Sequence, residues 1–427
     1  MLRLGIGWLR KHSQYGILLS VVIAWVILVT SEILPGVRQV TPGFAAYYAA
    51  SYAVLHGGAA DLNNNQAFAV WVARSGIDVQ EVFAGNAPTL ALFGLPFTLV
   101  SPDIAQTLWL LVNVALLVAA SWLAGRLCAP LNVTARLAII AVFALLAPVH
   151  ETLYYGQVYL LLAFLSLVAL AALRSQHDIL AGIAVAGMAL LKPYYGVLTF
   201  GLLIWSRRPR SILAMIGISL LVVVASLPLL AQAWPGFVQA QGSIEDMASA
   251  SVPANQTLNS LMRHLFEYSP GWNPDPLANL PLLATGLRYA LSLFLVSVTV
   301  WRAAKHQDDP FWIWPLALTL MPVLAPVGET HHDTLLLLPI AVAVTWLLER
   351  KARRLEALLI VTGLFLLIVP WPSLHDSANW QGWLGLLAYP RLMGAMLLWM
   401  ALLSCEDTTD GKFLPRTPQR LLPINDP

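Results

Sequence analysis

The chain has 427 residues, of which 58% are hydrophobic and only 11% are charged. About a quarter of the residues of a typical soluble domain are charged, so this composition excludes an ordinary soluble protein. The formal net charge of +2 comes without a long basic run, so nothing in the composition points to nucleic acid. The only cysteines, Cys128 and Cys405, supply neither a disulfide framework nor a cysteine metal motif.

Apolar runs of about 17–25 residues, long enough to cross a bilayer as helices, recur along the chain. The first, from about Tyr15 to Leu34, follows a basic N-terminus and is too long for the core of a cleaved signal peptide. The sequence predicts an all-α polytopic membrane protein of one domain (1–405) with a loose cytoplasmic tail (406–427). We expect about twelve spanning helices, at 15–34, 105–126, 134–150, 157–174, 178–192, 193–206, 211–232, 286–302, 310–327, 333–349, 355–371 and 389–405.

Charge in the short loops predicts how the chain is oriented in the membrane. Like the N-terminus, three loops are basic: 207–210, 301–307 and 349–354. The positive-inside rule places them in the cytoplasm, with both chain termini. The apolar segment 86–100 would reverse this orientation if it crossed, so we expect it to be re-entrant or interfacial. Two outer loops result, at about 35–104 and 233–285, and the first carries short interfacial helices at 44–57 and 59–76.

Polar residues gather at the predicted outer ends of the helices, in the stretches 150–157, 190–196, 255–264 and 328–333. Lys192 suits either snorkelling to the interface or neutralising a lipid phosphate. Arg263 is either a surface residue or a bidentate phosphate ligand. Gln157 either caps a helix end or contacts a sugar hydroxyl. The convergence of these groups from distant segments predicts a cavity at the outer leaflet.

The stretch GETHHD (328–333) is the most polar of these clusters. His331 and His332 are neighbours, so on a helix they point about 100° apart and do not form the i, i+4 pair that chelates one metal. They suit interfacial positions, or hydrogen bonding to an anionic ligand. With Glu329 and Asp333 nearby a metal site remains an alternative, but we expect none.

Six stretches, taken in order, resemble the GT-C-fold membrane glycosyltransferases that use polyprenyl phosphate sugars, specifically glycosyltransferase family 87. They are GFAAYYAASYAVLHG (43–57), NAPTLALFGLPFTLVSP (86–102), YYGQVYLLLAFL (154–165), AGIAVAGMALLKPYYGVL (181–198), NQTLNSLMRHLF (255–266) and APVGETHHDTLLLLP (325–339). The resemblance implies a GT-C-like bundle in the plasma (inner) membrane, with no cofactor and no nucleotide sugar. It also implies transfer of a hexose (mannose-like) or a pentose from a polyprenyl phosphate to a lipid or glycan acceptor on the extracytoplasmic face, with inversion.

The resemblance also assigns site residues. Donor-phosphate binding falls to four side chains: Lys192, Arg263, His331 and His332. Sugar or acceptor binding falls to Tyr47, Tyr48, Tyr154, Tyr155, Gln157, Asn255 and Gln256. One position departs from the family, because the expected base Asp before the Phe of the first outer loop is here Gly43.

Three other carboxylates are alternative bases for deprotonating the acceptor hydroxyl: Glu32, Glu151 and Asp61. Each has a structural alternative, as an interfacial anchor, a loop carboxylate and a helix N-cap, respectively. Two other functions stay open: a transporter or flippase of lipid-linked sugars, and a catalytically inactive family member that lacks the base. A transporter would favour ionisable residues near the bilayer midplane and internal repeats, and neither is evident.

Overall fold

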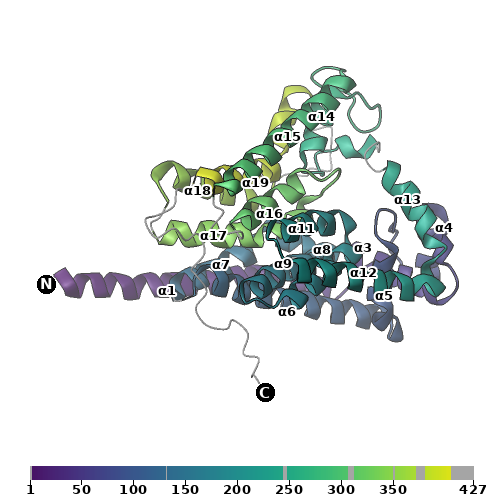
Figure 1. The fold of residues 1–427 in the computed structure, drawn as a ribbon, viewed down its shortest axis with the longest axis horizontal. Helices are drawn as coiled ribbons and strands as arrows, with labels where there is room; N and C mark the ends of the chain where they lie inside the picture. Colours follow the sequence, from purple (N-terminus) through teal and green to yellow (C-terminus); the bar gives the residue numbers. More distant parts are fainter. Residues whose placement is uncertain are drawn as a thin grey trace.

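The computed structural model describes residues 2–130, 132–243, 248–305, 312–349, 352–371 and 380–404. Within these ranges the backbone forms helices joined by loops, and no strand is present (Figure 1). The predicted all-α fold is therefore confirmed. Cys405 and the predicted tail at 406–427 lie outside the described residues.

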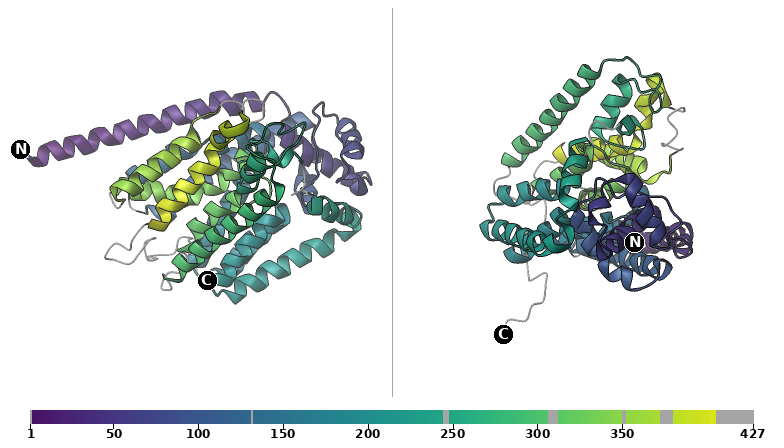
Figure 2. Two further views of the ribbon diagram at one scale, coloured as in Figure 1. Left: turned by 90° about the horizontal axis from the view of Figure 1, so that it is seen from above. Right: turned by 90° about the vertical axis from the view of Figure 1, so that its right-hand side faces the viewer.

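The N-terminal part of the chain is one long helix followed by several short ones. Helix α1 (Leu2–Leu28) continues through a π-helical turn, η1 (Val29–Ile33), into α2 (Leu34–Gly36), and its first turns project from the bundle (Figures 1 and 2). The predicted first outer loop contains α3 (Pro42–Leu55), η2 (Ala59–Asp61), α4 (Asn65–Arg74), α5 (Pro88–Gly94) and η3 (Leu95–Leu99). Helices α3 and α4 are close to the two short helices predicted for this loop.

The rest of the chain alternates long and short helices. The first group is α6 (Pro102–Cys128), α7 (Val133–Leu145), α8 (Ala147–Tyr155), α9 (Tyr159–Arg174), α10 (Asp178–Leu191), α11 (Pro193–Trp205), α12 (Pro209–Leu230) and α13 (Ala233–Ser243). The second is η5 (Ala248–Ser251), α14 (Leu258–Phe266), α15 (Pro281–Ala304), α16 (Ile313–Val323), η6 (Thr330–Leu336), α17 (Leu337–Leu348), α18 (Arg354–Ile368), η8 (Gly382–Ala388) and α19 (Pro390–Ser404). Proline opens many of these helices, where its missing N–H has no intrahelical partner to lose.

Several helices are long and apolar enough to cross a membrane. Within the described residues there are five such stretches: Tyr15–Gly36, Pro102–Cys128, Pro209–Leu230, Pro281–Ala304 and Thr330–Leu348. Two bent pairs, α7 with α8 and η8 with α19, raise the number to seven if each pair is one span. The chain is thus a multi-pass membrane protein. Other predicted crossings coincide with helices too short to meet this criterion, so a total of about twelve stays a prediction.

One predicted helix is wrong in its extent. The sequence predicts a single helix over 134–150 and a polar loop after it, but the chain bends by 52° after α7 and forms the separate helix α8. Pro148 lies in the first turn of α8, where it cannot donate a hydrogen bond to α7. Gly156, with a φ of +68°, then ends α8 in the left-handed conformation that glycine tolerates best.

The packing of the helices buries η6 at the centre of the bundle. This short helix contacts α8, α9 and α16, while α10 packs between α9 and α12. His331 and Asp333 are only 5% and 3% exposed. The cluster predicted for the outer rim is therefore enclosed by protein on most sides.

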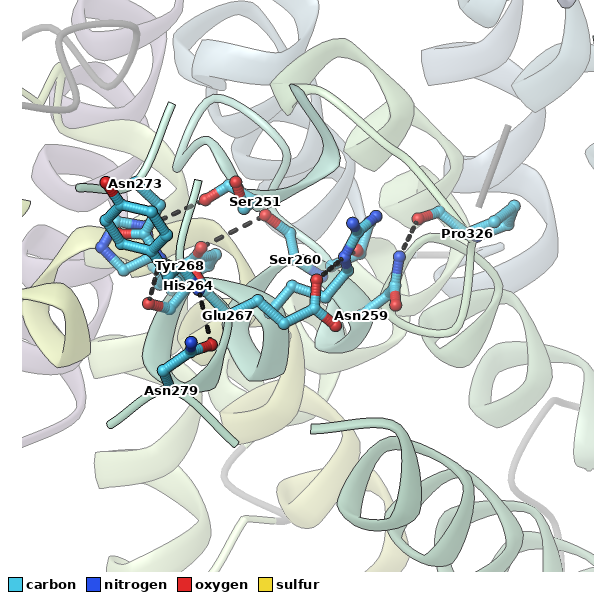
Figure 3. Close-up of polar contacts among 12 residues, drawn as sticks. Ser251, Asn259, Ser260, His264, Glu267, Tyr268, Asn273, Asn279 and Pro326 are labelled. Atoms are coloured by element: carbon cyan, nitrogen blue, oxygen red, sulfur yellow. Dashed lines mark hydrogen bonds and ion pairs between the residues drawn. The ribbon is translucent and has the colours of Figure 1, made fainter. Parts of the chain in front are cut away.

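Helix α14 organises the predicted second outer loop (Figure 3). Thr257 caps it by accepting a hydrogen bond from the Ser260 N–H at 3.1 Å. His264 places Nδ1 2.9 Å from the carbonyl oxygen of Ser251, and Asn273 donates to the carbonyl oxygen of His264 at 2.7 Å. These bonds fix the loop, and with it the NQT triplet that precedes α14.

Candidate functional site

Two tyrosine hydroxyls hold the ring of His332. Its Nε2 lies 2.6 Å from the hydroxyl oxygen of Tyr159, and its Nδ1 lies 2.6 Å from that of Tyr195. A neutral imidazole donates through one nitrogen and accepts at the other. One tyrosine therefore accepts a hydrogen bond from His332, and the Tyr159 and Tyr195 hydroxyls also hydrogen-bond each other.

His331 presents a nitrogen that lacks a partner. Its Nδ1 is buried and has no hydrogen-bond partner among the described residues. The same atom lies 3.7 Å from a carboxylate oxygen of Glu329, and the ring centre is 4.9 Å from that of Tyr159. Buried polar atoms are nearly always hydrogen-bonded in folded proteins. The Nδ1 of His331 is therefore a candidate contact for a bound group.

Lys192 lies at the break between α10 and α11, where Pro193 prevents one helix from continuing into the next. Its ammonium donates to Oδ1 of Asn86 at 2.6 Å and lies 5.6 Å from the ring centre of Tyr159. Its positive charge also acts on both histidines. Lys192 thus belongs to the same cluster as His331 and His332.

The NQT triplet is paired with the start of the GETHHD stretch. Asn255 and Glu329 form an isolated antiparallel bridge. The Gln256 N–H donates to the carbonyl oxygen of Gly328 at 2.7 Å, and the Gly328 N–H donates to Oδ1 of Asn255 at 3.2 Å. The Gln256 side chain donates to the carbonyl oxygen of Ala388 at 2.9 Å. The two predicted sugar-binding residues therefore position the backbone around Glu329.

A buried arginine acts electrostatically on two acidic side chains. Arg391 is 3% exposed, and its guanidinium donates to the backbone carbonyl oxygens of Leu366 and Val369. Its positive charge acts on Glu151 and Asp333, and Glu151 also hydrogen-bonds the side chain of Thr330. Oδ2 of Asp333 is buried and has no hydrogen-bond partner among the described residues. Glu151, one of the predicted bases, is therefore held by Thr330 and lies in the field of a buried cation.

The predicted Gly-Gln pair sits where α8 ends. The Trp109 indole N–H donates to the carbonyl oxygen of Gly156 at 2.7 Å, which secures this corner. The Tyr47 hydroxyl donates to Oε1 of Gln157. Burial raises the pKa of Tyr47 above its usual range, and the negative charge of Glu81 adds to the rise. Tyr47 therefore stays protonated and can act as a hydrogen-bond donor.

The other two predicted bases have local partners. Glu32 forms an ion pair with His150 at 3.1 Å. Asp61 accepts a hydrogen bond from the indole N–H of Trp71 at 2.8 Å. The alternative role of Asp61 as a helix N-cap is wrong, because Asn64 caps α4 instead. Asp61 thus has a clear role in holding α4 in place.

The remaining predicted tyrosines differ in their surroundings. The Tyr48 hydroxyl donates to the carbonyl oxygen of Val100 at 2.9 Å, which fastens α3 to the end of η3. Tyr154 is 53% exposed, and its ring centre lies 4.9 Å from that of Tyr155. Tyr155 in turn lies 6.0 Å from the ring of His331. Of the three, Tyr155 is the one packed beside the histidine cluster.

Arg263 belongs to a different group from the other predicted phosphate ligands. It lies on α14 and forms an ion pair with Glu267, one helical turn later, at 2.6 Å. Lys192, His331 and His332 instead gather around Tyr159. The structure thus brings together three of the four predicted phosphate ligands in one cluster.

Several site residues were missed by the sequence reasoning. Asn86 opens an apolar segment, and Arg391 is a lone cation at the start of one. An ionisable residue in an apolar segment is a functional candidate by default, so Arg391 carried a usable signal. Tyr159 and Tyr195 carried none, because their role depends on His332, which is 173 and 137 residues away in sequence.

The cluster combines donors that suit an anionic oxygen with a nearby proton acceptor. The ammonium of Lys192 and the unsatisfied Nδ1 of His331 are both suited to phosphate oxygens. The carboxylate of Glu329 lies beside them and is 44% exposed. Such an arrangement can hold a phosphate ester and accept a proton from a neighbouring hydroxyl.

Comparison with known proteins gives one family. The model of glycosyltransferase family 87 matches residues 85–326, more than half of the 427-residue chain. The matched range includes Asn86, Gln157 and Lys192, whereas Gly43 and His331 lie outside it. Curated proteins and solved structures give no match.

Proposed function

Because the chain belongs to glycosyltransferase family 87, we propose that it transfers a sugar from a polyprenyl phosphate carrier to a lipid or glycan acceptor. The sugar is a hexose, mannose-like, or a pentose, and the anomeric carbon is inverted. The reaction takes place on the extracytoplasmic face of the plasma membrane, with both chain termini in the cytoplasm. The observation that carries this proposal is the cluster of Lys192, His331 and His332 around Tyr159.

The leaving group determines what the cluster must do. When the bond between the anomeric carbon and the phosphate oxygen breaks, negative charge develops on the polyprenyl phosphate. Lys192 is held by Asn86 and supplies a positive charge that needs no reorganisation during the reaction. His331 can add a hydrogen bond through its buried Nδ1. His332 acts indirectly, since both of its nitrogens already orient tyrosine hydroxyls.

The sugar requires hydrogen-bonding and stacking partners beside this cluster. The Gln157 side chain is oriented by Tyr47, and Tyr155 packs against His331. An oriented amide can hydrogen-bond the hydroxyls of a sugar, and an aromatic ring can pack against the face of the sugar ring. Gln157 and Tyr155 are therefore the sugar contacts best supported by their surroundings.

The lipid tail of the donor requires an apolar path. In the most apolar 18-residue stretch of each helix, only 11% of the residues in α12 and 17% of those in α15 are buried within the protein. In a membrane protein such exposed apolar faces lie against lipid hydrocarbon. These faces therefore place the protein in the same hydrocarbon phase as the polyprenyl chain of the donor.

Sugar transfer in proteoliposomes tests the proposal. The purified protein is supplied with radiolabelled polyprenyl phosphate mannose, glucose or arabinose, and with octyl mannoside as a hydroxyl acceptor. We expect labelled glycolipid from one donor, and loss of the product in the variant carrying Lys192→Ala, His331→Ala and His332→Ala. Full activity of the triple variant would overturn the proposal. Movement of the donor across vesicles without covalent transfer would favour a flippase instead.

A further inference from the structure

Glu329 has an unusual position among the carboxylates near the histidines. Its side chain is 44% exposed, whereas that of Glu32 is 12% exposed and Asp333 is buried. A general base must lie where a substrate hydroxyl that enters from outside the protein can reach it. Accessibility therefore favours Glu329 over these two.

The backbone around Glu329 is fixed from both sides. Asn255 pairs with Glu329 in the antiparallel bridge, and two hydrogen bonds join Gly328 to the NQT triplet. On the other side, η6 begins at Thr330 and is enclosed by α8, α9 and α16. A carboxylate on such a support is held in a defined place relative to the buried residues that follow it.

The surroundings of Glu329 are those of the phosphate cluster. One carboxylate oxygen lies 3.7 Å from the unsatisfied Nδ1 of His331. Its charge also acts on Lys192 and on Tyr155. A bound phosphate that contacts Nδ1 of His331 would therefore lie next to the Glu329 carboxylate.

The alternative carboxylates have other surroundings. Glu151 hydrogen-bonds Thr330 and lies in the field of the buried Arg391. Glu32 contacts His150 at 3.1 Å. The exposed fraction of its side chain and its contact with His331 therefore distinguish Glu329 as the carboxylate that borders the cluster.

On the basis of the proposed function, we propose that Glu329 is the general base that replaces the carboxylate missing at Gly43. The Glu329 carboxylate takes the proton of the acceptor hydroxyl as that oxygen bonds to the anomeric carbon. The bond between the anomeric carbon and the phosphate oxygen breaks, and its electron pair leaves with the polyprenyl phosphate. No oxidant, metal or further reactant is required for this balance.

Substitution of Glu329 by glutamine tests the assignment. General acid–base catalysis contributes about 10²–10⁴-fold to a rate, so we expect Glu329→Gln to lower kcat by at least about 100-fold. The donor KM should change by less than about threefold, because the phosphate contacts remain. Glu329→Asp should retain part of the rate, since it keeps a carboxylate that is shorter by one methylene. Asp103 is exposed, lies in the first turn of α6 and is distant from Glu329 in sequence. The variant Asp103→Asn is therefore the matched control, and its kcat and donor KM should equal those of the wild type.

Azide distinguishes a base from a structural residue. Azide attacks as an anion and needs no deprotonation, so Glu329→Gln should form glycosyl azide from the donor at close to the wild-type rate. Failure to do so, while the melting temperature is unchanged, would overturn the assignment. So would full transfer to octyl mannoside by Glu329→Gln, or azide rescue confined to Glu151→Gln. A wild-type protein that transfers no sugar would instead overturn the proposed function itself.

Discussion

Gly43 lies directly against Gln157 in the folded protein. A Cβ added at Gly43 would come within 2.5 Å of Nε2 of Gln157 and 2.6 Å of the backbone carbonyl oxygen of Tyr155. Side chains can give way, but the carbonyl of Tyr155 belongs to the fixed corner at the end of α8. The position that the family resemblance assigns to a base is thus closed to any side chain in this conformation.

We therefore predict that the Gly43→Asp variant gains no sugar-transfer activity over the wild type. Overpacking a filled site destabilises a protein by about 1–3 kcal/mol, so Gly43→Ala and Gly43→Asp should both lower the melting temperature in detergent. Gly201→Ala is the control, because nothing lies within 4 Å of a Cβ built at Gly201. A stable Gly43→Asp protein that gains turnover from nothing would show that the wild type is an inactive family member.

Gly156 should be equally intolerant, for a different reason. Its φ of +68° is disfavoured for residues with a side chain by roughly 1–2 kcal/mol. A Cβ there would also collide with the Thr41 hydroxyl and lie 3.0 Å from Cβ of Phe44. We expect Gly156→Ala to lower the melting temperature more than Gly201→Ala, and to reduce transfer by displacing Gln157. Equal melting temperatures for the two variants would contradict this account.

The sequence predicted the positions of most helices because they depend on local properties. Long apolar runs and helix-opening prolines are visible in any single segment, and α9, α10 and α11 begin and end within two residues of their predicted bounds. The sequence predicts that the polar residues between 150 and 157 lie at helix ends and in the connection between two helices. The helical structure of this stretch depends on Pro148 and Gly156, which define a short helix between two breaks.

The site was harder to predict because its contacts join distant segments. Lys192, His331 and His332 stand out as polar residues in apolar surroundings, and the structure brings them together. Their partners Tyr159 and Tyr195 look like ordinary helical aromatics. Likewise, an exposed Glu329 cannot be told from a buried Glu151 until the chain is folded.

The hydroxyls that hold His332 give a prediction about orientation. Tyr195→Phe removes one of the two hydrogen bonds to the His332 ring and leaves Nδ1 of His332 unsatisfied, which costs about 1–3 kcal/mol. We expect slower transfer with little change in the expressed yield. The double variant Tyr159→Phe, Tyr195→Phe should lose less than the sum of the two single losses in free energy, because both act through the same ring. Strict additivity of the two effects would show that the tyrosines act independently.

Asn86 should control the donor affinity through Lys192. Asn86→Ala removes the 2.6 Å hydrogen bond that positions the ammonium but leaves its charge. We expect the KM for the donor to rise several-fold, and by less than in Lys192→Met, which removes the charge. A donor titration at fixed acceptor concentration measures both values. If Asn86→Ala raised the KM for the donor more than Lys192→Met does, the hydrogen bond of Asn86 could not be acting through Lys192.

Two arginines should differ sharply in their importance for stability. Arg391→Met leaves the carbonyl oxygens of Leu366 and Val369 without their donor, and leaving a buried acceptor unsatisfied costs about 1–3 kcal/mol for each group. Arg263→Met breaks a pair between neighbouring turns of α14, for which about 1 kcal/mol is expected. Thermal unfolding in detergent compares the two variants. Equal melting temperatures for Arg391→Met and Arg263→Met would show that the hydrogen bonds of Arg391 to Leu366 and Val369 do not stabilise the fold.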